Sequence, residues 1–158
     1  MEQEITDDTL VFSRPAQDWS YKAVCKYYAF ECPNKAAYIV DEKVNFITFR
    51  TTGGEMKRVF RIEERLYMNL QDGYIAFQKN ENTPKEKLDR VRGYIKEMRK
   101  NTVVSQADLL EEKQIFLFSK EIISLPNRPK PIKRNNSYKC YYRLGDLKQK
   151  KAVEPVKI

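Results

Sequence analysis

Apolar and polar positions alternate most clearly in residues 46–67, where two short runs flank a glycine turn. Residues 46–50 are aromatic and β-branched, which is typical of a strand. Gly53 and Gly54 follow, and glycine readily adopts the positive φ angles of tight hairpin turns. In residues 56–62 the apolar face is predicted to be Met56, Phe60 and Ile62, and the basic face Lys57 and Arg61. The pattern predicts a β-hairpin whose apolar face is covered by other segments.

Three further segments show strand patterns. In residues 21–30 every second position is apolar or tyrosine, which predicts a strand with Cys25 on its core face. Residues 115–118 form a continuous apolar run, short enough for a strand buried on both faces. Residues 138–144 alternate again and are predicted to complete the sheet, with Cys140 facing the core. Shorter strands are expected at residues 11–15 and 37–40, the first of them at a sheet edge, and residues 74–78 are expected to form either a strand or one turn of helix.

The main helix is predicted from its N-terminal residues. Thr83, Pro84 and Glu86 fit a capping box with proline at the first helical position, so a helix is expected over about residues 83–100. Its apolar stripe is predicted to be Leu88, Val91, Ile95 and Met98. Gly93 costs this helix about 1 kcal/mol relative to alanine, which indicates that another group packs closely against it.

A second, short helix is predicted at about residues 105–112, because Ser105 and Asp108 have the spacing of another capping box. Strands are expected both before and after the main helix. This order predicts an α+β fold with a mostly antiparallel sheet, closed or nearly closed into a small barrel.

The chain is 158 residues long, which predicts a single domain over residues 1–158. Residues 1–9 are expected to be a loose acidic N-terminus, and residues 148–158 a frayed basic tail. The loop at residues 126–136 contains three prolines and several cations, so it is expected to be extended.

The positive charge of the chain is concentrated near its C-terminus. The net charge is +8, and residues 122–158 contain ten Lys or Arg residues against only Asp146 and Glu154. A localised excess of this kind favours a polyanionic partner, although a solvated basic tail would have the same composition.

The composition also excludes several kinds of chemistry. The chain contains no histidine, which removes Ser-His and Cys-His nucleophile schemes and histidine metal ligands. Its three cysteines, Cys25, Cys32 and Cys140, do not form a disulfide framework or a Cys-x-x-Cys zinc pattern, and inert thiols are expected. The N-terminus lacks the apolar stretch of a signal peptide, and no apolar run is long enough for a membrane span. A cytoplasmic protein without membrane partners is therefore expected.

Two segments resemble a known family type. Residues 38–63, with a Gly turn and a basic strand reading V-x-R-I-E, are similar to the central hairpin of PUA-like barrels of the EVE and ASCH type. Residues 115–132 are similar to the strand, I-x-L-P turn and Pro-rich loop of such modules. The G-x-K-x-x-E-x-R motif of ASCH domains is absent, so no ligand residue is carried over. The resemblance implies a compact barrel module that commonly binds RNA or modified DNA bases.

A basic surface is the main candidate site. Its predicted nucleic-acid-binding residues are Arg128, Lys130, Lys133, Arg134, Lys139, Tyr141 and Arg143. The cations would hold phosphates, and an exposed Tyr141 would stack on a base. The alternative is a solubilising face on which lysine and arginine stems half cover Tyr141.

Two further candidate sites are weighed. Trp19, Tyr28 and Phe30 could line an aromatic pocket for a flipped base or small ligand, although a lone tryptophan is more often part of a core. Asp41, Glu55 and Lys57 could form part of a metal-dependent nuclease site, although E-x-K sequences are common by chance and such carboxylates are often solvated.

Three functions remain open, in this order. The first is a nucleic-acid-binding module without catalysis, which could read a modified or extruded base from DNA or RNA. The second is a protein-interaction or regulatory module whose basic surface docks an acidic partner. The third is a metal-dependent nuclease. No cofactor or resident metal is expected under the first two hypotheses.

Overall fold

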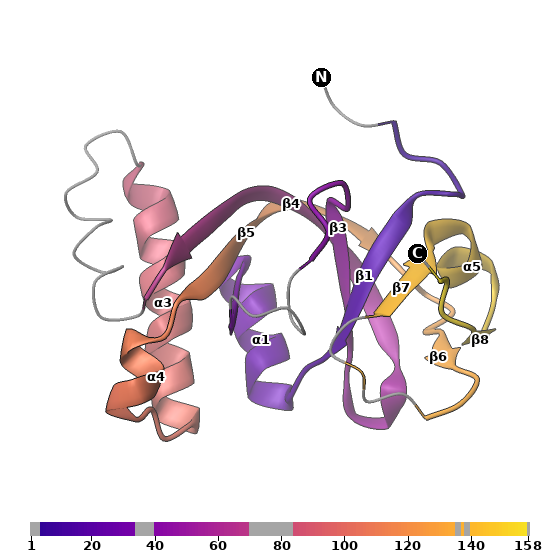
Figure 1. Cartoon of the computed structure of the whole chain (residues 1–158). Coiled ribbons are helices and arrows are strands. Elements are labelled where there is room, and N and C mark those ends of the chain that lie inside the picture. Colours follow the sequence, from indigo (N-terminus) through magenta and orange to yellow (C-terminus); the bar gives the residue numbers. More distant parts are fainter. Residues whose placement is uncertain (1–3, 34–39, 70–83, 135–136, 138–139, 158) are drawn as a thin grey trace. The chain divides into compact units, whose positions relative to one another are not determined.

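The computed structural model describes residues 4–33, 40–69, 84–134, 137 and 140–157. These residues form an α+β structure that divides into two compact units (Figure 1). Unit 1 comprises residues 1–17, 40–61 and 120–158, and unit 2 comprises residues 18–39 and 62–119. The helices are α1 (Asp18–Tyr27), α3 (Lys85–Asn101), α4 (Gln106–Leu110) and α5 (Leu144–Gln149). The strands are β1 (Leu10–Pro15), β2 (Ala29–Pro33), β3 (Phe46–Arg50), β4 (Met56–Met68), β5 (Lys113–Ser124), β6 (Lys130–Pro131), β7 (Cys140–Arg143) and β8 (Ala152–Val153).

The main sheet is mixed and open. Its strand order is β2-β5-β4-β3-β1-β7, so β2 and β7 are its edges and the sheet is not closed into the predicted barrel. β1 pairs with β3 in parallel, whereas the β1–β7, β2–β5 and β3–β4 pairs are antiparallel. β6 and β8 form a separate parallel pair in unit 1. The α+β class is therefore confirmed, and barrel closure is not.

The predicted hairpin is confirmed as β3 and β4, with Gly53 and Gly54 at φ angles of 85° and 87° in the turn. The side of the sheet predicted for Met56 was wrong. Thr48 pairs with Val59 but Arg50 pairs with Met56, so a bulge inserts one extra residue into β4. Met56 therefore faces the same side as Val59, opposite to Phe60 and Ile62.

Unit 1 is organised around β1 and β3. The predicted edge position of residues 11–15 was wrong, because β1 lies between β3 and β7 and its central side chains are buried. All five side chains of β3 are buried, so the sheet is covered on both faces here. One core cluster consists of Val11, Phe46, Met56, Val59, Leu125, Cys140, Tyr142, Leu144, Leu147 and Val153.

In unit 2 the predicted strand over residues 21–30 is instead helix α1, followed by β2. The alternating pattern is compatible with a helix because Ser20, Ala23 and Val24 also recur at helical spacing, and these are its buried residues. Tyr28, at a φ of 52°, ends the helix, and its N–H still donates to the Val24 carbonyl at 2.8 Å.

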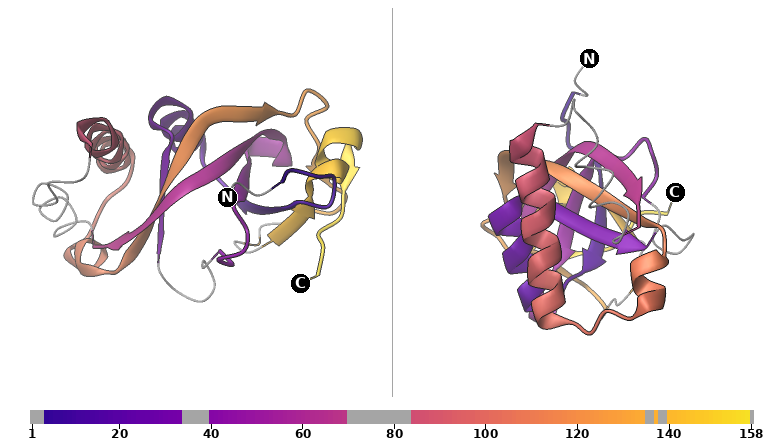
Figure 2. Two further views of the ribbon diagram at one scale, coloured as in Figure 1. Left: turned by 90° about the horizontal axis from the view of Figure 1, so that it is seen from above. Right: turned by 90° about the vertical axis from the view of Figure 1, so that its left-hand side faces the viewer.

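The main helix, α3, lies beside α1 in the same unit (Figures 1 and 2). Its buried residues are Arg90, Val91, Tyr94, Ile95 and Met98, which confirms most of the predicted stripe. Thr83 lies outside the described residues, and the residue before the helix is Pro84. The close neighbour predicted for Gly93 is the ring of Tyr27 on α1.

The other predicted elements of unit 2 also form. Ser105 and Asp108 make the expected capping box at α4. Residues 115–118 are all buried within β5, as predicted for a strand covered on both faces. Most of residues 37–40 and all of 74–78 lie outside the described residues.

The predicted frayed tail is instead folded onto unit 1. Residues 144–149 form α5 and residues 152–153 form β8, with Leu147 and Val153 buried in the core. The Val156 N–H donates to the Tyr141 carbonyl at 2.7 Å. Apolar side chains spaced among the cations therefore anchor the tail. In the described part of the chain, no helix combines the length and apolar character needed to cross a membrane.

Candidate nucleic-acid interface

The basic C-terminal segment presents its charge to solvent. Among the described residues after residue 121, every lysine and arginine is exposed. This basic surface consists of Arg128, Lys130, Lys133, Arg134, Arg143, Lys148, Lys150, Lys151 and Lys157. Lys139 lies outside the described residues. Four of the nine, Lys148, Lys150, Lys151 and Lys157, were missed as site residues because the tail was expected to fray.

Pairing of β6 with β8 joins the loop cations to the tail cations. Lys130 is in register with Ala152, and its N–H donates to the Lys151 carbonyl at 2.8 Å. The Ile132 N–H donates to the Val153 carbonyl at 3.0 Å, which extends this connection. Cations that are about twenty residues apart in sequence therefore share one surface of unit 1.

Asn127 connects the start of the loop to the end of α5. Its side-chain amide donates to the Leu147 carbonyl at 2.7 Å and to the Lys150 carbonyl at 2.6 Å. The last carbonyls of a helix lack partners within the helix, so a side-chain donor there stabilises its end. This contact positions Lys150 relative to the Pro-rich loop.

Replacing Asn127 with alanine is expected to lower the free energy of unfolding by about 0.5–1.5 kcal/mol, because the Leu147 carbonyl loses a part-buried donor, while water can replace the exposed bond to the Lys150 carbonyl. Amide hydrogen exchange should show reduced protection of the Lys150 N–H, which bonds to the Asp146 carbonyl. Asn101→Ala is the control, since its amide makes one exposed bond to the Glu97 carbonyl. Equal effects of the two substitutions would contradict this role for Asn127.

Tyr141 does not provide the predicted stacking surface. Its side chain is only 5% exposed and packs edge-on against Phe12, with ring centroids 5.4 Å apart. Its hydroxyl accepts a hydrogen bond from the Asp41 N–H at 3.3 Å. Strand alternation suggested exposure, but β7 is covered on both faces, so Tyr141 belongs to the interior of unit 1.

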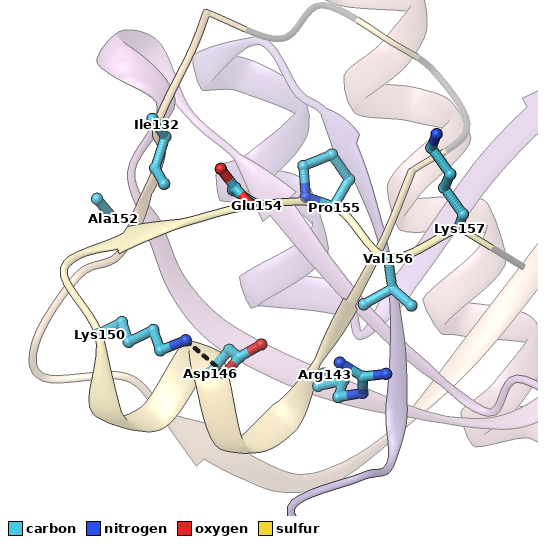
Figure 3. A pocket seen from close by; sticks show the side chains of 9 residues that line it. All are labelled: Ile132, Arg143, Asp146, Lys150, Ala152, Glu154, Pro155, Val156 and Lys157. Carbon is cyan, nitrogen blue, oxygen red and sulfur yellow. Dashed lines mark ion pairs between the residues drawn. The ribbon is translucent and has the colours of Figure 1, made fainter.

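A pocket of about 530 Å³ opens within the basic surface (Figure 3). Arg143, Lys150 and Lys157 line it, together with Asp146 and Glu154. Its apolar wall consists of Ile132, Ala152, Pro155 and Val156. Eight of the nine lining residues lie within residues 143–157, in β7, α5, β8 and the tail, and Ile132 follows β6.

The predicted aromatic pocket belongs to the packing of unit 2. Phe30 is buried and its ring centroid lies 6.0 Å from that of Tyr94 on α3. Trp19 is half-buried, with its ring centroid 6.3 Å from Tyr94. Phe30 and Trp19 therefore flank a core tyrosine, while Tyr28 ends α1.

The candidate nuclease residues do not form a cation site. Glu55 lies 3.9 Å from the guanidinium of Arg128, and an Asp41 carboxylate oxygen accepts from the Lys43 N–H at 2.8 Å. Within the described ranges, no group of three or more Asp, Glu, Cys or His side chains could hold a metal ion. The cysteines are free thiols; Cys32 and Cys140 are buried, and Cys25 is half-buried on α1.

Comparisons with known proteins add one structural neighbour. No family model matches the chain, and no curated protein matches it. A crystal structure of a mutant ZmASCH protein from Zymomonas mobilis is similar over 73% of this chain and 71% of that chain, with a TM-score of 0.41 and 9% identity. This neighbour is named as an ASCH protein. The ASCH type is one of the two PUA-like types that residues 38–63 and 115–132 resemble in sequence.

Proposed function

We propose that this protein binds nucleic acid through the basic surface of unit 1 and does so without catalysis. The observation that supports it is the exposure of all nine described cations after residue 121, together with the pairing of β6 with β8, which joins the loop cations to the tail cations. Within this segment only Asp146 and Glu154 balance them, and outside it Glu55 lies 3.9 Å from the guanidinium of Arg128. A dense, unbalanced set of lysines and arginines is the electrostatic footprint of a phosphate-binding surface.

The expected contacts are to phosphates rather than to base edges. Both described tyrosines of this segment, Tyr141 and Tyr142, are buried and offer no stacking surface. Lysine and arginine side chains release counterions when they neutralise phosphates, which makes such binding strongly salt-dependent. Reading of a modified or extruded base stays a prediction that would need contacts from other residues.

The loop cations give the sharpest test. Replacing Arg128, Lys130, Lys133 and Arg134 together with alanine should weaken binding to single-stranded and duplex nucleic acids. The slope of log K against log salt should become shallower by as much as about 3 to 4, since each lost phosphate contact removes about 0.7 to 0.9. Fluorescence anisotropy at several salt concentrations measures both the affinity and the slope.

The matched control removes four exposed cations from α3. Lys85, Lys96, Arg99 and Lys100 are all exposed, and replacing them with alanine lowers the net charge by the same amount. This control should leave the slope close to that of the unaltered protein. Equal effects of the two variants would show that net charge alone is responsible, which would contradict a localised interface.

Absence of binding to DNA and RNA at low salt would overturn the proposal. The second hypothesis, an acidic protein partner for the same surface, would then be tested with acidic peptides. The loop variant and the α3 control would distinguish a contact at the basic surface from a general charge effect.

A further inference from the structure

The pocket in the basic surface has features that a plain charged face lacks. Arg143 reaches it from β7, Lys150 from the end of α5, and Lys157 from the tail (Figure 3). Their backbones are held by the pairing of β1 with β7, by Asn127 and by the Val156 N–H bond to Tyr141. Cations from three separate, anchored segments therefore line one concavity, and Figure 3 shows the Lys157 ammonium directed away from Arg143 and Lys150.

Some cations of the pocket are neutralised by a neighbouring carboxylate and others are not. Lys150 pairs with Asp146 at 3.1 Å, so these two charges largely cancel. The guanidinium of Arg143 is exposed and makes no hydrogen bond or ion pair to another residue that the structure describes. Arg143 is therefore available to a ligand, and its planar fork of N–H donors matches two oxygens of a phosphate.

The other wall of the pocket is apolar and accessible. Ile132 is 55% exposed, and it lines the pocket with Pro155 and Val156. A volume of about 530 Å³ is larger than an inorganic anion needs and lies within the range of small-molecule sites. The pocket therefore suits an anionic group attached to a less polar body, such as a sugar with its base.

We propose that this pocket binds a phosphomonoester, the terminal phosphate of a nucleic-acid strand. This inference rests on the proposed function. A terminal phosphate carries a charge of about −1.5 to −2 near neutral pH, more than the single charge of a bridging phosphate. Arg143 would bind its oxygens, while Ile132 and Val156 would contact the terminal nucleoside.

The experiment compares one oligonucleotide sequence in three forms, with a 5′-phosphate, a 3′-phosphate or hydroxyl groups at both ends. A phosphorylated end should bind about tenfold more tightly than the unmodified strand. Arg143→Gln should remove most of this preference while the unmodified strand loses at most a few-fold. Lys96→Gln, an exposed charge on α3, is the matched control and should keep the full preference.

Glu154 provides a test of opposite sign. Its exposed carboxylate lines the pocket and would repel a bound phosphate. Glu154→Gln should therefore increase the preference for the phosphorylated end by about two- to fivefold. Glu42→Gln, an exposed carboxylate outside the lining of this pocket, is the control and should leave the preference unchanged. A decrease with Glu154→Gln would overturn the assignment.

The outcomes separate this inference from the proposed function. Equal, salt-dependent binding of all three strands would overturn the pocket assignment and leave the basic surface as a phosphate-backbone interface. Absence of binding by any strand would overturn the proposed function. A nucleoside monophosphate tests whether the bound phosphate belongs to a free ligand instead of a strand end. If it binds as tightly as the phosphorylated strand and loses the same affinity in Arg143→Gln, the pocket is a phosphomonoester site. That result would overturn the strand end as the ligand.

Discussion

Replacing Arg90 with methionine is expected to lower the free energy of unfolding by about 3–5 kcal/mol. Arg90 lies on α3 and is only 8% exposed. Its guanidinium donates to three backbone carbonyls of unit 2, those of Tyr27 at 3.0 Å, Tyr28 at 2.6 Å and Phe118 at 2.6 Å. One side chain thus joins α3 to the end of α1 and to β5.

Methionine keeps much of the apolar volume of the arginine stem but has no donor. A buried carbonyl without a donor has lost its hydrogen bonds to water and gained none in return. The resulting loss of stability is larger than the stability gained by removing a buried charge. Tyr28 is affected least, because its carbonyl also accepts from the Phe118 N–H at 2.8 Å. The loss of stability should therefore come mainly from the other two carbonyls.

Denaturant unfolding followed by the fluorescence of Trp19 measures this effect, since Trp19 lies in the same unit. Arg99→Met is the matched control, because Arg99 is exposed in the last turn of the same helix and should change stability by less than about 0.5 kcal/mol. A loss for Arg90→Met no larger than that of this control would contradict the structural role of the guanidinium.

Gly93→Ala should destabilise the protein by about 1–3 kcal/mol, although alanine is the better helix former. A Cβ at position 93 would overlap the Tyr27 ring, with the Tyr27 Cζ only 2.7 Å away. The ring therefore has to move, and α1 and α3 lose their close contact. Thermal or denaturant unfolding of the single variant gives the sign of the effect.

A double-mutant cycle with Tyr27→Ala identifies the cause. Without the Tyr27 ring, Gly93→Ala should stabilise the protein by about 0.5–1 kcal/mol, its helix propensity gain. The change of sign between the two backgrounds is the decisive result. A stabilising Gly93→Ala in the unaltered protein would show that the ring moves aside freely, and the close-packing explanation would be wrong.

Local patterns predicted several elements correctly because their determinants lie close together in sequence. The β3–β4 hairpin depends on two adjacent glycines whose positive φ angles the turn requires. The start of α4 depends on Ser105 and Asp108, three residues apart. Even the close neighbour of Gly93 was indicated, because a glycine within a strong helix pattern implies a steric reason.

Other expectations failed where one pattern fits two structures. Residues 21–27 alternate as in a strand and also place Ala23 and Val24 on a helical face, so packing against α3 decides between them. Tyr141 looked exposed because strand alternation assumes one solvated face, yet β7 is covered on both. The bulge that reverses Met56 likewise depends on pairing with β3.

The concentration of charge after residue 121 is a property of the amino-acid sequence, and it is sufficient by itself to predict a basic surface. The pocket within that surface could not be found in this way. It requires Lys130 to pair opposite Ala152, Asn127 to hold the end of α5, and the tail to lie along β7. These contacts join residues distant in sequence, and burial of Leu147 and Val153, rather than any local preference, stabilises them.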